Sequence, residues 1–506
     1  MREEAASDVA GSFHVAVVGG GISGLSTAWY VEQQAAARGV SVLCSVYESA
    51  DRWGGRILTD IVDRQEGRFV VEGGPDSFLA GQKPWAVDLA LELGLAERLL
   101  GTNDAARKVY VLSRGKPVRL PEGVFLLIPT KFKPFLLSPL ISPLGKLRMG
   151  LDLVIPARKG SEDETLGDFV SRRLGSEALD KIAEPLLSGI YNAEAQRQSL
   201  LATFPRFRET ELAYGSLLRG MLAAKAQARN TRNKDDGGAS VAAGGRPNSM
   251  FASFIDGTEE LVAGLTGRLN ARLRPGAGVR SLRPDAGRGY LLEVSGSDGD
   301  GRAHETVRVD AVVLAIPAYD AAELLASVCP EAAAILHTVR YVSTGTMSLA
   351  YGQEGSAERL GGFGVLVPRS EKRPLNAITW SSTKFDHRAP QGHSLLRVFF
   401  GGSRSPGSMQ LDDDELLAVV KKELRGIMGI AKEPLFHCIY RWDRANPQYD
   451  VEHLRRVEGI EQALPVGIWV TGSAYRGVGL PDCVHQGRIT ADKVVEQLTG
   501  LQRSAL

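Results

Sequence analysis

Cysteine pairs, charge bias and long apolar runs are all scarce in this chain of 506 residues. Its four cysteines are scattered, and none forms a C-x-x-C pair, which leaves no support for a disulfide framework or a cysteine-based zinc site. No run approaches the roughly 18 apolar residues of a membrane-spanning helix. The formal net charge is +1, so nothing global points to nucleic acid as a partner.

Targeting and catalytic signatures are missing as well. Residues 1–8 carry acids early and no apolar core, which argues against a secretory signal and an organelle transit peptide. With the unpaired cysteines, this predicts a cytoplasmic protein. The eight histidines never lie at i, i+4, and neither a Ser-His-Asp set nor a metal-ligand spacing stands out. We therefore assign no catalytic residue and no metal.

The most informative stretch reads Val-Ala-Val-Val-Gly-Gly-Gly-Ile-Ser-Gly-Leu from residue 15. It predicts a buried parallel strand, a glycine turn and a helix start, with Gly19, Gly21 and Gly24 at the spacing of a dinucleotide fold. Gly19 allows a tight turn, Gly21 lets a diphosphate approach, and Gly24 lets the helix pack on the strand. The N–H groups around Ile22 and Ser23 at the helix start are then free to bind the diphosphate.

An acidic residue follows the next predicted strand. The valine-rich run from residue 40 to 47 ends at Glu48, 24 residues after Gly24. An acidic side chain about 20 residues beyond the glycines accepts hydrogen bonds from a ribose 2′-OH in such folds. A solvated glutamate at a strand end is the alternative.

Two more glycine pairs lie within about 50 residues of the first turn. They are Gly54 and Gly55 with Arg56, and Gly73 and Gly74 with Pro75. Further close backbone approaches suit a long two-headed cofactor better than a nicotinamide nucleotide. In this order, the elements resemble those of the flavin amine oxidase and protoporphyrinogen oxidase superfamily. The resemblance implies FAD as the cofactor.

The predicted fold class is α/β, with a discontinuous Rossmann-like FAD-binding domain, a mixed-sheet α+β substrate domain and a helical cap. The ranges are 12–100, 249–318 and 462–500 for the FAD-binding domain, 319–461 for the substrate domain and 101–223 for the cap. Within the cap range, residues 108–120 look like a hairpin. The glycine-rich polar stretch 224–248 predicts a flexible surface loop.

Apolar residues interleaved with cations mark the chain between residues 124 and 156. From residue 116 to 159, eight Lys or Arg side chains stand against Glu122 and Asp152. Such a segment can lie in a membrane interface without spanning it. A cap whose apolar face closes over a substrate cavity explains the pattern equally well. Peripheral contact with the inner face of the membrane therefore stays open beside the cytoplasmic prediction.

A strand, a glycine turn and a helix recur near the C-terminus, at 468–498. In the family that the chain resembles, this helix start lies beside the isoalloxazine and the ribityl chain, which implies Gly472, Val478, Gly479 and Leu480 as flavin-side residues. The family also holds the adenine through backbone groups of a valine, which corresponds to Val279. An ordinary strand–helix turn is the alternative.

Three stretches are spelled most like the bacterial porphyrinogen oxidases that use oxygen, namely 73–78, 186–191 and 477–483. This resemblance implies six-electron oxidation of a tetrapyrrole in three rounds of hydride transfer to FAD, with O₂ as acceptor and peroxide as product. The substrate it implies is coproporphyrinogen III, protoporphyrinogen IX or both, in haem biosynthesis. Transfer of the product to a ferrochelatase is left open.

The resemblance also implies substrate-binding residues. Asp76 matches a position next to the tetrapyrrole, where a carboxylate could bind pyrrole N–H groups; an Asx turn is the alternative. Ile190 and Trp380 match apolar positions that sandwich the macrocycle. The family's propionate-binding arginine has no clear equivalent, and the candidates to replace it are Arg107, Lys108 and Lys83.

Two other functions compete. A flavin amine oxidase acting on a primary amine or polyamine would need an aromatic cage, and only Tyr475 lies near the expected place. A non-catalytic partner-binding protein on the same scaffold, like the GDP dissociation inhibitor relatives, would not need the retained glycines, Glu48 and Arg56.

Overall fold

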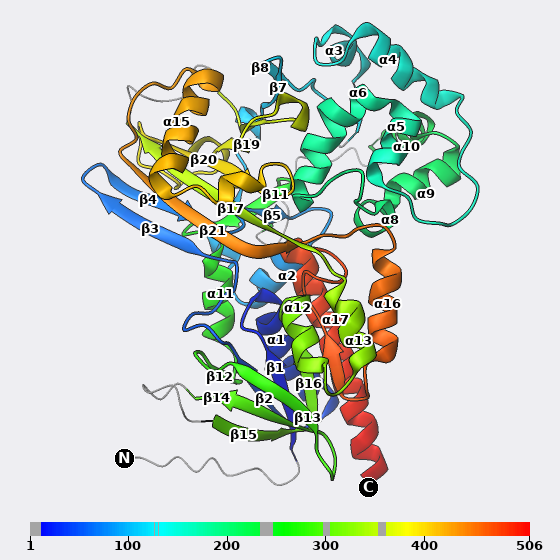
Figure 1. The fold of residues 1–506 in the computed structure, drawn as a ribbon, viewed down its shortest axis with the longest axis vertical. Coiled ribbons are helices and arrows are strands. Elements are labelled where there is room, and N and C mark those ends of the chain that lie inside the picture. The colour runs from blue at the N-terminus through cyan, green and yellow to red at the C-terminus, as the bar shows by residue number, and fades with distance from the viewer. Residues whose placement is uncertain are drawn as a thin grey trace.

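A computed structural model describes residues 12–125, 127–129, 131–232, 246–296, 304–352 and 361–505. The molecule is elongated, with a five-stranded parallel sheet towards one end and a seven-stranded sheet beside a group of helices at the other (Figure 1). The predicted α/β class, with its discontinuous Rossmann-like domain, is confirmed. The sequence prediction for residues 1–8 lies outside the described residues.

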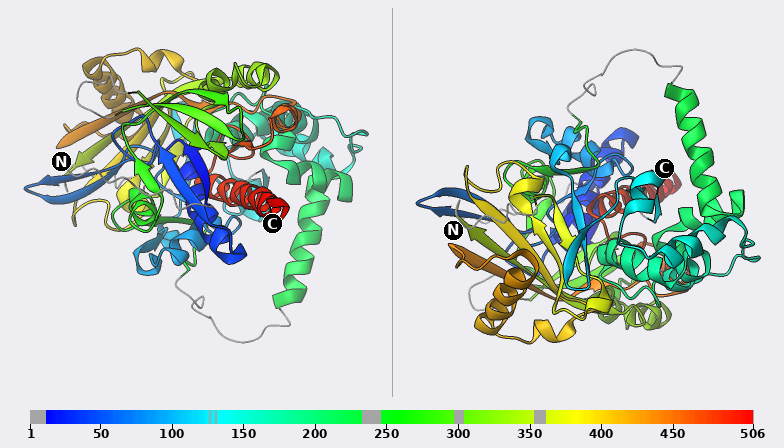
Figure 2. Two further views of the ribbon diagram at one scale, coloured as in Figure 1. Left: turned by 90° about the horizontal axis from the view of Figure 1, so that it is seen from below. Right: turned by 90° about the horizontal axis from the view of Figure 1, so that it is seen from above.

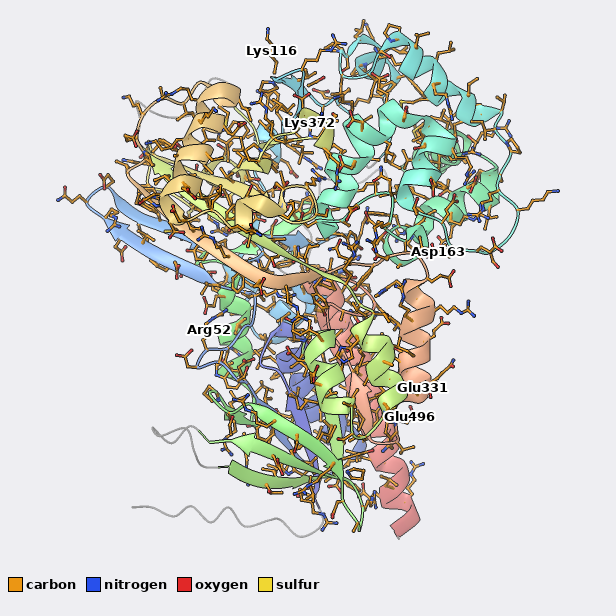
Figure 3. All side chains as sticks on the ribbon, in the orientation of Figure 1. Arg52, Lys116, Asp163, Glu331, Lys372 and Glu496 are labelled. Carbon is orange, nitrogen blue, oxygen red and sulfur yellow. The ribbon has the colours of Figure 1, made fainter. Side chains whose placement is uncertain are left out.

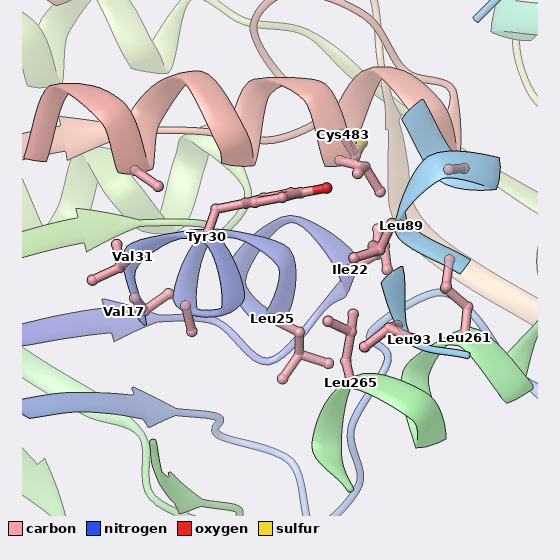
Figure 4. Packing of buried hydrophobic residues seen from close by; sticks show 14 of the residues in the cluster. Val17, Ile22, Leu25, Tyr30, Val31, Leu89, Leu93, Leu261, Leu265 and Cys483 are labelled. Carbon is pink, nitrogen blue, oxygen red and sulfur yellow. The ribbon is translucent and has the colours of Figure 1, made fainter. Parts of the chain in front are cut away.

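The parallel sheet is built from strands far apart in the chain. Its order is β12-β2-β1-β16-β22, and the bounds are β12 Arg272–Arg274, β2 Val42–Tyr47, β1 Phe13–Val18, β16 Ala311–Leu314 and β22 Ile468–Val470. Helices α1 (Ile22–Arg38) and α17 (Leu480–Ala505) pack side by side on one face. Figure 4 shows Tyr30 of α1 lying towards α17, which carries Cys483, whereas Leu25 of α1 points to Leu265 of α11 (Glu259–Thr266). Val17 is fully buried beneath them.

The other face of this sheet is covered by a second layer. A three-stranded antiparallel sheet lies there, with β13 Val279–Pro284, β14 Tyr290–Ser295 and β15 His304–Val309. Three helices share the same core, namely α12 Ala318–Leu325, α13 Pro330–His337 and α16 His453–Ala463. These three helices lie at the two ends of the range 319–461 that the sequence predicts as the substrate domain. They pack on the nucleotide-binding domain, because their apolar faces are buried against β16 and β22.

The large sheet is mixed, with the order β21-β17-β20-β19-β18-β7-β8. The bounds are β21 Phe436–Pro447, β17 Tyr341–Tyr351, β20 Ser394–Gly401, β19 Leu375–Trp380, β18 Gly364–Leu366, β7 Val109–Ser113 and β8 Lys116–Arg119. Helix α15 (Asp413–Met428) covers one face through Leu416, Val420 and Leu424. The first two strands of the range predicted as cap, β7 and β8, thus belong to this sheet. Figure 3 places Lys116 and Lys372 at its outer end.

The cap proper is helical from α3 onward. It contains α3 Phe132–Leu137, α4 Pro143–Gly150, η3 Leu151–Leu153, α5 Leu166–Leu174, α6 Ser176–Ala178, the π-helix η4 Leu179–Ser188, α7 Gly189–Tyr191, α8 Leu200–Thr203, α9 Pro205–Tyr214 and α10 Leu217–Arg232. The side chain of Thr165 accepts from the Asp168 N–H, as expected of an N-cap. Helix α10 stands out from the body (Figure 2). It continues into the range 224–248 predicted as a loop, of which 233–245 lie outside the described residues.

Short elements join these layers. They are the hairpin β3 Thr59–Arg64 and β4 Gly67–Glu72, the small sheet of β5 Phe78–Leu79, β11 Phe251–Phe254 and β6 Leu99–Gly101, the two-stranded β9 Val124–Phe125 and β10 Ile128–Pro129, and the helices α2 Trp85–Glu92, α11 Glu259–Thr266 and α14 Ser381–Lys384.

Candidate functional site

A cavity of about 630 Å³ lies between the carboxyl ends of the parallel strands and the large sheet. The β1–α1 turn and the end of β2 form one part of its wall. The glycine loops at 54–57 and 73–75 and the start of α17 form another. The end of the cap at 189–192 and strands β17, β20 and β21 complete it. Ligands of open α/β sheets bind at this edge, where the strands end.

The first glycine turn has the geometry that a diphosphate needs. Gly19 has φ +110, which side chains rarely adopt. A Cβ on Gly24 would meet the carbonyl oxygen of Gly19 at 1.9 Å. The N-cap of α1 is Gly21, without a side-chain cap, so the first N–H groups of the helix lack side-chain acceptors. The turn therefore presents hydrogen-bond donors and the positive end of a helix dipole to the cavity.

Glu48 is held at the end of β2 with its carboxylate oriented. One oxygen accepts the N–H of Gly20 at 2.7 Å, and the other accepts the N–H of Ala50 at 2.8 Å. The second oxygen also accepts the Ser49 hydroxyl at 3.2 Å, whereas the oxygen bound by Gly20 keeps a lone pair for a further donor. This is the arrangement expected of a carboxylate that binds a ribose hydroxyl.

The second glycine loop is tied to the first. The Gly54 N–H donates to the Gly20 carbonyl at 2.9 Å. The guanidinium of Arg52, labelled in Figure 3, donates to the carbonyls of Trp53 and Ile57 at 3.3 and 3.1 Å. Both loops are thereby fixed against one wall of the cavity.

The third loop is fixed from the large sheet. The Trp442 indole N–H donates to the Gly73 carbonyl at 2.9 Å, and the Arg397 guanidinium donates to the Gly74 carbonyl. A Cβ on Gly74 would meet the Arg56 carbonyl oxygen at 1.8 Å. Strands β20 and β21 therefore set the position of a loop that begins more than 300 residues earlier.

The charged groups on the cavity wall are few. Among the described lining residues they are Glu48, Asp320, Arg56 and Arg397. Burial raises the pKa of Asp320 and lowers the pKa of both arginines, which stay protonated because the ordinary pKa of arginine exceeds 12. Burial also raises the pKa of the nearby Cys483 to about 11, so this thiol stays neutral.

These features fit FAD. The donors of the β1–α1 turn would hold its diphosphate and Glu48 its ribose. The start of α17, with Val478 and Leu480 on the cavity wall, would place a helix N-terminus beside the flavin. When bound, FAD supplies the two-electron acceptor.

The structure brings most of the predicted cofactor residues together on the cavity wall. The exceptions are Gly24, Val279 and Gly479. Gly24 instead packs against the glycine turn, which is the role its motif position predicts. Val279 begins β13 next to Gly278, whose Cβ would lie 3.3 Å from the Ser49 Cβ.

Of the predicted substrate residues, only Ile190 lines the cavity, with its side chain 59% exposed. The prediction for Trp380 is corrected by the register of its strand, β19. Trp380 pairs with Leu396 and shares the α15 face with Val398, whereas Arg397 and Phe399 alternate onto the cavity face. Its assignment to the macrocycle fails because side chains change face at every residue along a strand.

Asp76 lies behind the wall. Its carboxylate accepts from Lys384 Nζ at 3.0 Å and from the Ser77 hydroxyl at 2.8 Å. Burial alone would raise its pKa, but Lys384 and Arg397 together hold the pKa below its usual range. The carboxylate is thus an internal counter-ion, and the expected contact with pyrrole N–H groups is not supported.

None of the three candidate cations lines the cavity. Arg107 and Lys108 are exposed, and Lys83 is paired with Asp482 at 2.7 Å. Sequence reasoning missed Arg397, Phe399 and Trp442. One signal existed for Arg397: it is the only charged residue in the apolar run from Leu395 to Phe400, and such residues are rarely buried without a reason.

The fold and this cavity define an FAD-dependent oxidoreductase. The chain belongs to the flavin containing amine oxidoreductase family, whose model matches residues 22–495. It is 33% identical to a coproporphyrinogen III oxidase of Bacillus subtilis, covering 96% of this chain and 99% of the relative, and 36% identical to one of Propionibacterium freudenreichii, covering 97% and 92%. A chloroplastic protoporphyrinogen oxidase of Oryza sativa is 30% identical, covering 96% and 88%.

Solved structures agree on the fold. A crystal structure from Exiguobacterium sp. 255-15, provisionally assigned as a protoporphyrinogen oxidase, matches with a TM-score of 0.80 and 29% identity, covering 96% of this chain and 99% of that one. A putrescine oxidase matches with a TM-score of 0.63 at 18% identity, covering 96% and 99%.

Proposed function

We propose that this protein oxidises a porphyrinogen to the porphyrin in haem biosynthesis, with coproporphyrinogen III as the first substrate to test and protoporphyrinogen IX as the second. The observation that carries the proposal is the continuity of the cavity. The part of the cavity lined by the β1–α1 turn, where the diphosphate would lie, is continuous with a part lined by Ile190, Phe399 and Trp442. The second part adjoins the predicted flavin position. A relative named coproporphyrinogen III oxidase and one named protoporphyrinogen oxidase both align over nearly the whole chain.

The reaction would remove six hydrogens from the macrocycle in three rounds. In each round the macrocycle would lose a hydride and a proton, for which bound FAD would supply the two-electron acceptor; three O₂ would finally take the six electrons and six protons as three H₂O₂. The protein would contribute proximity, because its apolar walls would hold a meso C–H of the macrocycle against the flavin. It would also exclude water from the reacting face.

The competing amine oxidase function is disfavoured by charge. Tyr475, the expected cage residue, is 2% exposed in the nucleotide-domain core and does not line the cavity. Tyr191, Phe399 and Trp442 could supply aromatic walls instead. Arg397, however, stands beside Phe399 and would repel an ammonium group held there, whereas the two carboxylates of the wall come from the end of β2 and from α12.

Side-by-side assays test the proposal. We expect purified yellow protein to release peroxide with coproporphyrinogen III or protoporphyrinogen IX and not with putrescine. A colourless protein would contradict every oxidase function and would favour the non-catalytic partner-binding protein instead. Turnover of putrescine alone would reject the porphyrinogen. Transfer of the product to a ferrochelatase stays a prediction.

We also propose that the cap rests on an anionic membrane surface. Leu137, Leu144, Leu147 and Val154 of α3, α4 and the residues after them are 68–79% exposed, and Lys131 and Lys133 flank them. Helices α3 and α4 lie at the end of the molecule farthest from the parallel sheet (Figure 1). Apolar residues rimmed by cations suit an interfacial position. No helix of the described chain is long and apolar enough to cross a bilayer.

Vesicle sedimentation tests this surface. The double substitution Leu144→Ser/Leu147→Ser should lower binding to vesicles with anionic lipid more than tenfold, because each buried leucine contributes about 1.5–3 kcal/mol. Leu212→Ser, at a residue 59% exposed on α9, is the matched control and should change little. Equal binding of all three proteins, or no binding by the wild type, would reject the membrane proposal.

A further inference from the structure

A group of five charged side chains lies behind the Gly73–Gly74 loop: Glu72, Arg388 and Arg397 are buried, and Asp76 and Lys384 are partly exposed. Asp76 pairs with Lys384 at 3.0 Å, and Glu72 lies 3.8 Å from Arg388. Arg397 is the fifth member. Three cations and two carboxylates leave one positive charge, and burial of an uncompensated charge is costly.

Arg397 is the cation of this group that has no direct ion pair, although Asp76 and Glu72 attract its charge from a longer distance. Its side chain is 2% exposed, and no carboxylate of the described residues forms an ion pair with it within 4.0 Å. One nitrogen, Nη2, donates to the Gly74 carbonyl, with weaker contacts to the Gly73 carbonyl and the Thr346 hydroxyl at 3.5 Å. The Nε–H has no partner. Neutral carbonyls orient the guanidinium without cancelling its charge.

Arg397 also faces the cavity. It lies in β20 on the face opposite α15, and it lines the cavity together with Phe399 on the same strand. The guanidinium carbon lies 4.9 Å from the centre of the Phe399 ring. An apolar surface that a flat ring could cover thus adjoins a buried cation.

We propose that Arg397 binds a carboxylate of the substrate at the sheet side of the cavity. This inference rests on the proposed function, which supplies a macrocyclic substrate carrying carboxylates. Arginine suits the task because its planar donors match a carboxylate and its charge survives burial. It would take the place of the exposed cations at 107 and 108.

Porphyrins whose carboxylates are free or esterified test the proposal. With holoenzyme, we measure by fluorescence quenching the binding of coproporphyrin III and of its tetramethyl ester in one detergent buffer. Wild-type protein should prefer the free acid by about 10- to 100-fold, the range expected of one charged hydrogen-bonded contact. Arg397→Gln should reduce this ratio to near one, and Arg397→Lys should retain part of it.

The matched controls are Arg107→Gln and Lys108→Gln, which remove an exposed cation and should keep the wild-type ratio. A wild-type ratio near one would overturn the proposal even if Arg397→Gln does not fold. So would loss of the ratio in a control variant, or an unchanged ratio in Arg397→Gln. If Arg397→Gln shifted only the flavin reduction potential and left the ratio unchanged, the partner would be the flavin and the proposal would fail.

The outcomes separate this inference from the proposed function. If the protein oxidises porphyrinogens but binds the free acid and the ester equally well, the proposed function stands and the carboxylate contact is rejected. If the protein binds coproporphyrin III through Arg397 but oxidises no porphyrinogen, the carboxylate contact stands and the proposed function is rejected.

Discussion

Gly24 illustrates how a single residue controls the cofactor site. Its Cα lies where any side chain would meet the carbonyl oxygen of Gly19, and a Cβ there would also lie 3.3 Å from the Ala315 Cβ. The helix can therefore start close to β1 only if residue 24 has no side chain. The position of the first N–H groups of α1, which would hold the diphosphate, follows from this contact.

We expect Gly24→Ala to lower FAD retention at least tenfold, because the helix must move away from the turn. The measurement is the ratio of flavin to protein absorbance after gel filtration. Gly150→Ala is a matched control, since a Cβ there meets nothing within 4 Å. Full retention of FAD by Gly24→Ala would contradict the packing argument.

His453 is a second residue with a measurable consequence. It is fully buried, stacks on the Tyr449 ring at 3.8 Å and bonds the Tyr475 carbonyl through Nε2 at 2.8 Å. Burial lowers its pKa to about 4. An unfolded histidine, with its pKa near 6.5, binds a proton more readily. Stability from the neutral ring is therefore present above pH 6.5 and lost as the pH falls towards 4.

The expected loss between pH 6.5 and 4 is on the order of 3 kcal/mol, measured by denaturant unfolding at several pH values. His453→Gln should flatten this part of the pH profile. His437→Gln, at an exposed position on β21, should leave it unchanged. Parallel profiles for all three proteins would show that His453 is not the titrating group.

At the scale of elements, the cap combines a hydrophobic core around Leu166, Phe169 and Ile182 with a buried ion pair. Arg173 of α5 and Asp152 of η3 are both completely buried, with Nη2 and Oδ1 2.5 Å apart. Arg173 also donates to the Ile155 carbonyl at 2.9 Å and the Gly215 carbonyl at 2.9 Å. One side chain thus joins α5, η3 and the turn before α10.

Arg173→Leu should destabilise the protein by about 3–5 kcal/mol, because it leaves a buried carboxylate without its partner. Thermal unfolding measures the loss, and limited proteolysis should cut the cap first. Arg68→Leu removes an exposed ion pair with Asp256 and should cost less than about 1 kcal/mol. A similar small effect of Arg173→Leu would mean that the cap does not depend on this pair.

At the scale of the whole molecule, the cofactor cavity is closed by segments from the start, the middle and the end of the chain. The β1–α1 turn, the strands of the large sheet and the start of α17 all line it. A ligand that touches all of them stabilises only the assembled state. Cofactor binding and long-range assembly are therefore coupled.

Removal of FAD should consequently lower the melting temperature of the whole protein, and added FAD should raise it in a concentration-dependent way. At a free FAD concentration 100 times Kd, the expected gain is about 2.7 kcal/mol. Differential scanning calorimetry over a series of FAD concentrations measures it. A melting temperature that is independent of FAD would contradict the coupling.

Local patterns in the sequence determined the cofactor site. The spacing of Gly19, Gly21 and Gly24, and the position of Glu48 after a strand, depend on a strand–turn–helix unit that is nearly continuous in the chain. Such units keep their geometry in most surroundings, so Gly19, Gly21 and Glu48 meet on one cavity wall, and their binding of the diphosphate and the ribose stays a prediction. The prediction of an α/β fold rests on the same periodic elements.

Tertiary structure alone decided what faces the substrate end of the cavity. Whether Trp380 or Arg397 lines it depends on the register of β19 against β20, and a shift of one residue reverses every side chain. Whether Asp76 and Lys83 are free depends on Lys384 and Asp482, which lie some 300 and 400 residues away. No local pattern carries these pairings, because side-chain contacts between distant segments form only when the sheets and helices assemble.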